Sequence, residues 1–213
     1  MQKSVSLADQ VFERLEQDIL TGKYARGSYL TEAQICQEYG VSRTPVRAAL
    51  DLLEAEHIVE SNSKGTMVLG VTEQDADDIY EIRRRVEVLA AAYCARRITP
   101  EQLAVLNDIL DYQELCVEKK NSEQVKALDS EFHTKLYEFS GSIVLYDTLV
   151  PLHRKIQKYR QRSVEENSRA KASNVEHRAI VEAIASGDPE AAEKAMLAHL
   201  TSAQNHLKEI KAI

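Results

Sequence analysis

The 213-residue chain has no tryptophan, three phenylalanines, four prolines, seven glycines and three cysteines. Few glycines and prolines leave few sites for tight turns, so a β-sandwich or a nucleotide-binding sheet with glycine-rich loops is disfavoured and long helices are favoured. The cysteines (Cys36, Cys94 and Cys116) are too few and too scattered to form a disulfide framework. A reducing compartment is therefore expected.

Long apolar runs are also missing. No stretch approaches the ~18 consecutive apolar residues of a membrane helix, and residues 1–17 contain no apolar core of signal-peptide length. Hydrophobic residues make up 44% of the chain and charged residues 29%, as in ordinary globular domains. We therefore expect a cytoplasmic protein that does not contact a membrane, with one large domain or two small ones at ~150 residues per domain.

The chain also lacks an overall excess of positive charge. The 27 Lys and Arg residues stand against 34 Asp and Glu residues, which gives a net charge of −7. Residues 1–68 carry 7 basic and 10 acidic side chains, and residues 69–213 carry 20 and 24, so neither part is basic. Because binding to phosphates needs positive charge, any nucleic-acid binding would have to depend on a local cluster.

Residues 1–70 are predicted to form three helices followed by a β-hairpin. Ser6, Thr31 and Ser42 are suitable N-caps, and Gly40 can end a helix because glycine adopts positive φ readily. The apolar spacing and these signals predict helices over 7–20, 31–39 and 42–53, and strands over 58–60 and 66–69 with a turn at 62–65. The second and third helices are typical of a helix-turn-helix, and the hairpin is typical of a wing.

Residues 71–213 follow a helical pattern throughout. The predicted helices cover about 72–97, 99–120, 121–139, 142–162, 174–187 and 188–210, and 163–173 is the most polar loop. Six helices joined by short loops predict an antiparallel all-α bundle. The fold class is therefore mainly α, with a winged helix-turn-helix followed by a bundle of about six helices.

The segment 39–50 carries the features of DNA recognition. In a helix-turn-helix, the first residues of the second helix enter the major groove, where arginine can pair with guanine O6 and N7. The residues on or near that first turn are Ser42, Arg43, Thr44 and Arg47. Lys64 and Gly65 lie at the hairpin tip, from which a wing contacts the minor groove or the backbone. The alternative is a helical hairpin with two solvent-exposed arginines.

Residues 19–68 resemble the winged helix-turn-helix of GntR-type transcription regulators. The matching motifs are Ile19-Leu20-x-Gly22, Gly27-x-x-Leu30, Gly40-Val41-Ser42-Arg43-Thr44-Pro45-Val46-Arg47-x-Ala49-Leu50 and Gly65-Thr66-x-Val68. The resemblance implies a homodimer that binds a palindromic operator on double-stranded DNA, usually as a repressor. Some branches of the family carry a further basic residue on the second helix, where this chain has Gln34.

Four side chains in the second part have the chemistry of a metal site. Asp129 and His133 are four residues apart on one helical face, and His177 and His199 fall in the last two predicted helices. Together they could bind zinc, nickel, manganese or iron within the bundle. The alternative is three unrelated histidines, each hydrogen-bonded in the core or solvated. The remaining histidines have no such spacing and are predicted to be structural: His57, His153 and His206.

Residues 72–210 resemble the all-helical FCD domain that follows the winged helix in one branch of GntR regulators. The matching stretches are Ile82-Arg83-x-x-Val86-Glu87, Leu128-Asp129-x-x-Phe132-His133, Glu176-His177-x-x-Ile180, Ala183-Ile184-x-x-Gly187-Asp188 and Ala195-Met196-x-x-His199-Leu200. The resemblance implies that Asp129, His133, His177 and His199 bind a divalent metal. It also implies that a small carboxylate effector binds beside the metal, with Arg83 in the cavity.

Arg83 has an alternative role, as a surface ion-pair partner of Glu87 four residues later. The sequence also departs from the family at Gly141-Ser142, where Gly-Asn is common. The resulting hypothesis is a metabolite-responsive DNA-binding regulator that is not an enzyme. The rival hypotheses are a regulator for which the metal itself is the signal and, less well supported, a metalloenzyme that activates water.

Overall fold

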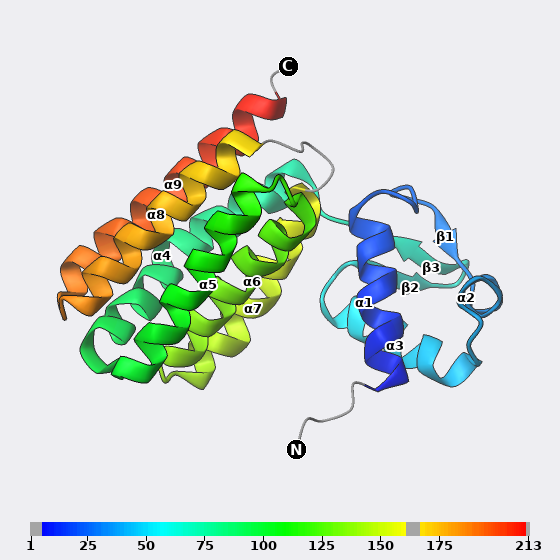
Figure 1. Cartoon of the computed structure of the whole chain (residues 1–213). Coiled ribbons are helices and arrows are strands. Elements are labelled where there is room, and N and C mark those ends of the chain that lie inside the picture. The colour runs from blue at the N-terminus through cyan, green and yellow to red at the C-terminus, as the bar shows by residue number, and fades with distance from the viewer. Residues whose placement is uncertain (1–5, 161–166, 212–213) are drawn as a thin grey trace. The chain divides into compact units, whose positions relative to one another are not determined.

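A computed structural model of the chain describes residues 6–160 and 167–211 (Figure 1). The chain divides into two compact units, Met1–Glu73 and Gln74–Ile213, and each has its own hydrophobic core. Within the described residues, no helix has both the length and the apolar character needed to cross a membrane.

The first unit contains three helices and a small sheet. Its elements are α1 (Leu7–Leu20), β1 (Tyr29–Leu30), α2 (Glu32–Tyr39), α3 (Arg43–Ala55), β2 (Val59–Asn62) and β3 (Gly65–Val68). Ser6 and Asp9 form a capping box at the start of α1, and Gly40 ends α2 with a φ of 68°. Helices α1 and α3 pack together, with Leu15 and Leu53 among their fully buried side chains.

The sheet has one strand more than the sequence predicts. Its order is β1-β3-β2 with antiparallel pairing, and β1 pairs Tyr29 with Met67 and Leu30 with Thr66. A strand of two residues cannot show the alternating pattern from which strands are predicted. Strand β2 extends to Asn62 and β3 begins at Gly65, so the hairpin turn is shorter than expected.

Six helices make up the second unit in the part of the chain that the structure describes. They are α4 (Glu73–Arg97), α5 (Pro100–Glu118), α6 (Ser122–Phe139), α7 (Ile143–Arg160), α8 (Asn167–Ala185) and α9 (Pro189–Lys211). Helix α5 packs against α6 and α8, α6 against α7, and α8 against α9. Figure 1 shows α8 and α9 side by side along the bundle. The predicted bundle is therefore present.

The prediction of a polar loop over 163–173 is wrong from residue 167 onward, because α8 begins there, seven residues before the predicted start; residues 163–166 lie outside the described part. The polar residues belong to a helix whose inner face makes polar contacts. Arg169, Ser173 and Asn174 are buried. Asn174 Nδ2 donates hydrogen bonds to the Leu110 carbonyl at 3.0 Å and to Gln113 Oε1 at 3.1 Å. Polarity here marks a buried helix face whose side chains have polar partners, and not an exposed loop.

Candidate functional site

The N-terminal end of α3 exposes the predicted DNA-contact residues. Pro45, Val46, Ala49, Leu50 and Leu53 are buried in the first unit. The opposite side of the helix start is exposed to solvent and carries Ser42, Arg43, Thr44 and Arg47. The Ser42 side chain makes no capping hydrogen bond, so the first-turn N–H groups remain open to an acceptor such as a phosphate oxygen.

Arg47 is held by an acidic residue of the neighbouring helix. Its Nε donates a hydrogen bond of 2.7 Å to Glu32 Oε1 on α2, and its side chain is 61% exposed. This hydrogen bond, with a smaller electrostatic effect of Arg43, lowers the pKa of Glu32. The local positive cluster is therefore partly neutralised by Glu32.

The hairpin tip presents Lys64 to solvent. Its backbone N–H donates to Asn62 Oδ1 at 2.9 Å, which shapes the turn. Gly65 has a φ of 128°, and a Cβ atom added there would lie 3.5 Å from the Leu30 carbonyl oxygen of β1. Glycine is suited to this position because that backbone conformation strains other residues.

Three buried histidines from three helices converge inside the second unit. They are His133 of α6, His177 of α8 and His199 of α9, and one ring nitrogen of each lies within 4.8 Å of the others. His177 Nε2 is 3.3 Å from His199 Nε2. Because ligand nitrogens lie ~2 Å from an ion such as zinc, they are ~3–4 Å apart in a shared site. The distance between His177 and His199 lies in this range, and the three-histidine cluster as a whole is compact enough that it could hold one metal ion.

Two carboxylates orient the rings of the three-histidine cluster. His133 Nδ1 lies 2.7 Å from Glu87 Oε1, and His199 Nδ1 lies 2.8 Å from Glu176 Oε2. When Nδ1 donates to a carboxylate, Nε2 keeps its lone pair, as in the carboxylate–histidine–metal arrangement of many proteins. Glu87 and Glu176 belong to the quoted motifs, but the sequence did not assign them this role.

Two histidines of the cluster have lowered pKa values, which leaves their rings free of positive charge that would repel a cation. Burial and the neighbouring imidazoles lower the pKa of His177, and burial lowers the pKa of His199 to about 4 although Glu176 opposes the shift. Both rings are therefore neutral near pH 7. His177 Nδ1 is buried and has no hydrogen-bond partner among the described residues.

Asp129 borders the cluster but stands outside its tightest group. Its Oδ1 is 3.9 Å from His177 Nε2 and 3.5 Å from Ser173 Oγ. Its Oδ2 accepts a hydrogen bond from Gln157 of α7. The structure thus brings all four predicted ligands into one region, with the three imidazoles closer together than the carboxylate.

Arg83 is buried and forms an ion pair with Glu87. Its Nε donates to Glu87 Oε2 at 2.7 Å, and its Nη2 lies 3.3 Å from Oε1. The side chains are 3% and 0% exposed, so the pair is not the surface pair considered as the alternative. Although burial opposes it, Arg83 and then His133 hold the pKa of Glu87 well below its usual range. In this arrangement Arg83 holds the Glu87 carboxylate in place. The contact of Arg83 with an effector stays a prediction.

His153 of α7, which is predicted from the sequence to be structural, is a neighbour of the three-histidine cluster. Its ring centroid lies 4.4 Å from that of His133, and the side chain is buried. Burial, with His133 and Arg83, holds the pKa of His153 well below its usual range, so the ring is neutral. Its inward position follows from a stripe at four-residue steps, Leu145, Leu149, His153 and Gln157.

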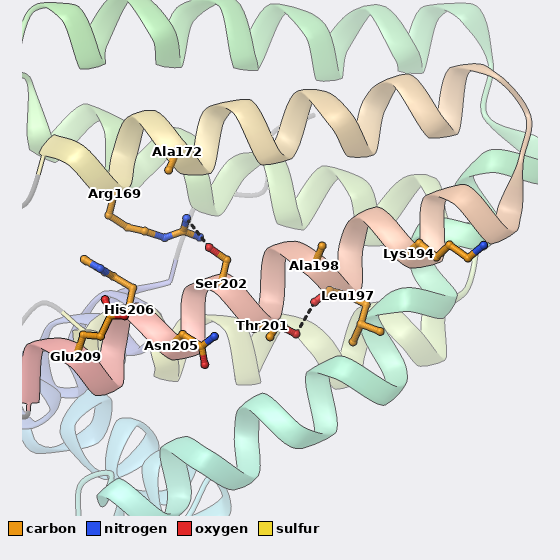
Figure 2. Close-up of a pocket in the computed structure, with 10 residues that line it drawn as sticks. All are labelled: Arg169, Ala172, Lys194, Leu197, Ala198, Thr201, Ser202, Asn205, His206 and Glu209. Carbon is orange, nitrogen blue, oxygen red and sulfur yellow. Dashed lines mark hydrogen bonds between the residues drawn. The ribbon is translucent and has the colours of Figure 1, made fainter.

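A surface groove along α8 and α9 connects to the cluster through hydrogen bonds (Figure 2). Arg169 and Ser202 line it, and Figure 2 shows the Arg169 guanidinium directed at the Ser202 hydroxyl. Arg169 donates to both oxygens of Glu176 at 2.8 Å, and Ser202 Oγ donates to Glu176 at 2.7 Å. Glu176 in turn lies against His199, so the groove and the cluster share one hydrogen-bond network.

Comparison with known proteins assigns both units. Residues 7–68 match the family model "Bacterial regulatory proteins, gntR family", and residues 78–202 match the model "FCD domain". The HTH-type transcriptional regulator YdhC of Bacillus subtilis is 29% identical over 203 residues, which cover 94% of this chain and 91% of YdhC. The HTH-type transcriptional repressor RspR of Escherichia coli is 26% identical over 203 residues, which cover 95% of this chain and 89% of RspR.

Solved structures show the same fold. The structure of Escherichia coli McbR/YncC aligns with a TM-score of 0.78 at 21% identity, and the alignment covers 97% of this chain and 99% of that one. This likeness confirms the predicted fold class, a mainly helical chain with a winged helix-turn-helix followed by a helical bundle.

Proposed function

Because the chain belongs to the GntR family of bacterial regulatory proteins and carries an FCD domain, we propose that it is a ligand-responsive transcriptional repressor. It would act in the cytoplasm, where operator DNA lies. The helical unit would bind one divalent metal ion and a small carboxylate effector. The observation that carries the proposal is the buried cluster of His133, His177 and His199.

The residues of the cluster suit a divalent ion. His133, His177 and His199 would hold it, with Asp129 as a fourth ligand, because neutral imidazoles and a carboxylate bind zinc, nickel, manganese and iron. A bound ion of this kind would offer open coordination positions to an anionic oxygen. The chain's own contribution is orientation, since Glu87 and Glu176 fix His133 and His199.

The N-terminal end of α3 would read the operator. Arg43 and Arg47 are exposed and have the reach to pair with guanine, while Ser42 and Thr44 suit phosphate oxygens. Lys64 at the hairpin tip would contact the backbone or the minor groove. A homodimer would place two such units on the two halves of a palindromic operator.

An effector can change DNA binding only if it binds two arrangements of the protein with different affinities. The candidate site is suited to this, because its polar side chains come from α4, α6, α7, α8 and α9. A ligand among them would contact several helices at once. The rival function is a metal sensor, which the orientation of His133 and His199 by Glu87 and Glu176 also favours.

The first test measures the affinity of the purified protein for the DNA upstream of its own gene by fluorescence anisotropy.

The second test measures the zinc content of the protein. We expect about one zinc ion per chain in the wild type, loss of that ion in His199→Ala, and unchanged metal content in His57→Asn. His57 is exposed with a φ of 56°, which asparagine tolerates.

Three outcomes decide between the functions. A DNA affinity that changes with carboxylates in zinc-loaded protein, but not in His199→Ala, supports effector control. A change caused by zinc alone supports metal sensing. Full zinc occupancy in His199→Ala would remove the cluster from the metal site.

A further inference from the structure

His153 is a buried polar side chain whose two ring nitrogens are both left without a hydrogen-bond partner among the described residues. The side chain is 5% exposed. In either neutral tautomer an imidazole carries one N–H donor and one lone pair. Leaving both unmatched in the interior is energetically costly, so a polar occupant is expected beside the ring.

The position of His153 ties that occupant to the metal-binding region. The ring lies against His133, 4.4 Å between centroids, and 6.3 Å from the ring of Tyr137. One turn further along α7, Gln157 donates a hydrogen bond to Asp129. The inner face of α7 therefore borders the three-histidine cluster with one imidazole and one amide.

The neighbouring charges restrict what the occupant can be. The Arg83 guanidinium is already paired with Glu87, so it does not offer an uncompensated positive charge to a second carboxylate. An uncharged group that can both donate and accept a hydrogen bond fits the two ring nitrogens of His153.

We propose that His153 selects hydroxycarboxylate effectors by hydrogen bonding to a hydroxyl group of a ligand whose carboxylate lies at the three-histidine cluster. A hydroxyl satisfies both needs of the ring, since it can donate to the nitrogen lone pair and accept from the N–H. A site built to bind a hydroxyl rejects the analogue that lacks it, because the buried polar groups are then left unmatched. This inference rests on the proposed binding of a metal and a carboxylate.

The experiment compares acids that differ by one hydroxyl. Zinc-loaded protein is titrated calorimetrically with three pairs: glycolate and acetate, lactate and propionate, malate and succinate. In at least one pair, we expect the hydroxy acid to bind ~10-fold or more tightly than its partner. The variant His153→Phe keeps a ring of similar size and removes both nitrogens. In this variant, the two members of the pair should bind alike, near the affinity of the acid without the hydroxyl.

Two controls make the result specific. Thr148→Ala changes a polar side chain on the exposed side of the same helix and should keep the preference of the wild type. His153→Phe should retain one zinc ion per chain by elemental analysis, because His153 lies outside the group whose ligand atoms converge. Loss of zinc in that variant would show that the residue supports the metal and not the hydroxyl, which overturns the inference.

The remaining outcomes separate this inference from the proposed function. If the acids bind without a hydroxyl preference, or if the preference survives in His153→Phe, the role of His153 is wrong and the carboxylate site stands. If neither member of any pair binds zinc-loaded protein, the carboxylate effector is wrong and the inference falls with it.

Discussion

Single side chains decide where the histidine rings of the second unit point. Glu87 is held by Arg83 from its own helix, one turn away, whereas Glu176 is held by Arg169 of α8 and Ser202 of α9. Because Arg83 and Glu87 are almost fully buried, their charges depend on each other and on His133. A buried pair of this kind makes a weak net contribution to stability, but breaking it is costly.

The first prediction follows from the difference between removing one member of the buried ion pair and removing both. Arg83→Met leaves the Glu87 carboxylate buried without its main partner, so we expect the free energy of unfolding to fall by ~3–5 kcal/mol. The double variant Arg83→Met/Glu87→Met removes both charges and should lose less than the single variant. Urea denaturation followed by circular dichroism measures both. A cost below ~1 kcal/mol for the single variant is incompatible with a buried pair.

The thiols provide a second prediction at this scale. Cys94 is buried and donates to the Leu136 carbonyl oxygen at 3.2 Å, and burial raises its pKa to about 12. At pH 9, about one in a thousand Cys94 thiols would then be the reactive thiolate. Iodoacetamide should therefore modify the partly exposed Cys36 first, and Cys94 only after denaturation in guanidinium. Rapid labelling of Cys94 in folded protein at pH 8 would contradict this burial.

Individual helices differ in how well their starts can be predicted from the sequence. Ser6 and Thr31 are local signals that predicted where α1 and α2 begin, and their side chains accept hydrogen bonds from the backbone N–H groups of Asp9 and Gln34. The start of α8 was missed because Arg169 and Ser173 look like loop residues until their buried partners are known. Local composition cannot distinguish a polar lining from a polar surface.

The candidate site shows the same limit. The motif spacing and the family resemblance identified His133, His177 and His199, which the fold brings together. His153 was missed because no second ligand-type residue stands at a helical interval from it, and its four-residue stripe with Leu145 and Leu149 is that of an ordinary core face.

The third prediction concerns α3 and the wing. Arg43→Ala should weaken operator binding by ~1–3 kcal/mol if it pairs with a base, and Lys64→Ala should weaken all sequences alike and lower the salt slope by about one. Glu32→Gln should strengthen binding several-fold, because it releases Arg47 and removes a negative charge near the phosphates. Anisotropy titrations over a salt series measure these effects. Binding by Arg43→Ala equal to wild type would exclude it from base recognition.

The fourth prediction concerns the link between α8 and α9. Glu176→Gln keeps the size of the side chain but weakens its hold on His199 Nδ1, so zinc affinity should fall ~10- to 100-fold. Competition with a chromogenic chelator measures the change. Glu182→Gln, an exposed change on the same helix, serves as the control. Equal zinc affinity in Glu176→Gln and the control would mean that the carboxylate does not position the ring.

At the scale of the whole molecule, a unit that matches the gntR family model and a unit that matches the FCD model, each with its own core, share one chain. Regulation then requires that binding in one unit changes the affinity of the other. Thermodynamic linkage makes this change reciprocal, whatever structural route carries it.

The fifth prediction uses this reciprocity. If zinc changes operator affinity, operator DNA must change zinc affinity by the same factor, and couplings of ~1–3 kcal/mol correspond to ~5- to 150-fold. Both affinities can be measured on one preparation, by anisotropy for DNA and by chelator competition for zinc. His177→Ala should abolish the coupling together with metal binding. A zinc effect on DNA affinity that persists in this variant would place the responsible ion elsewhere.

Helix α7 differs from its neighbours around the cluster. The three cluster histidines lie on α6, α8 and α9, and the carboxylates that orient two of them lie on α4 and α8. A substitution at His153 on the inner face of α7 can therefore alter the chemistry next to the cluster while His133, His177 and His199 stay in place. Under the proposed function, copies of the gene that arise by duplication could come to bind different metabolites through changes on this one helix, while keeping the same metal and the same operator.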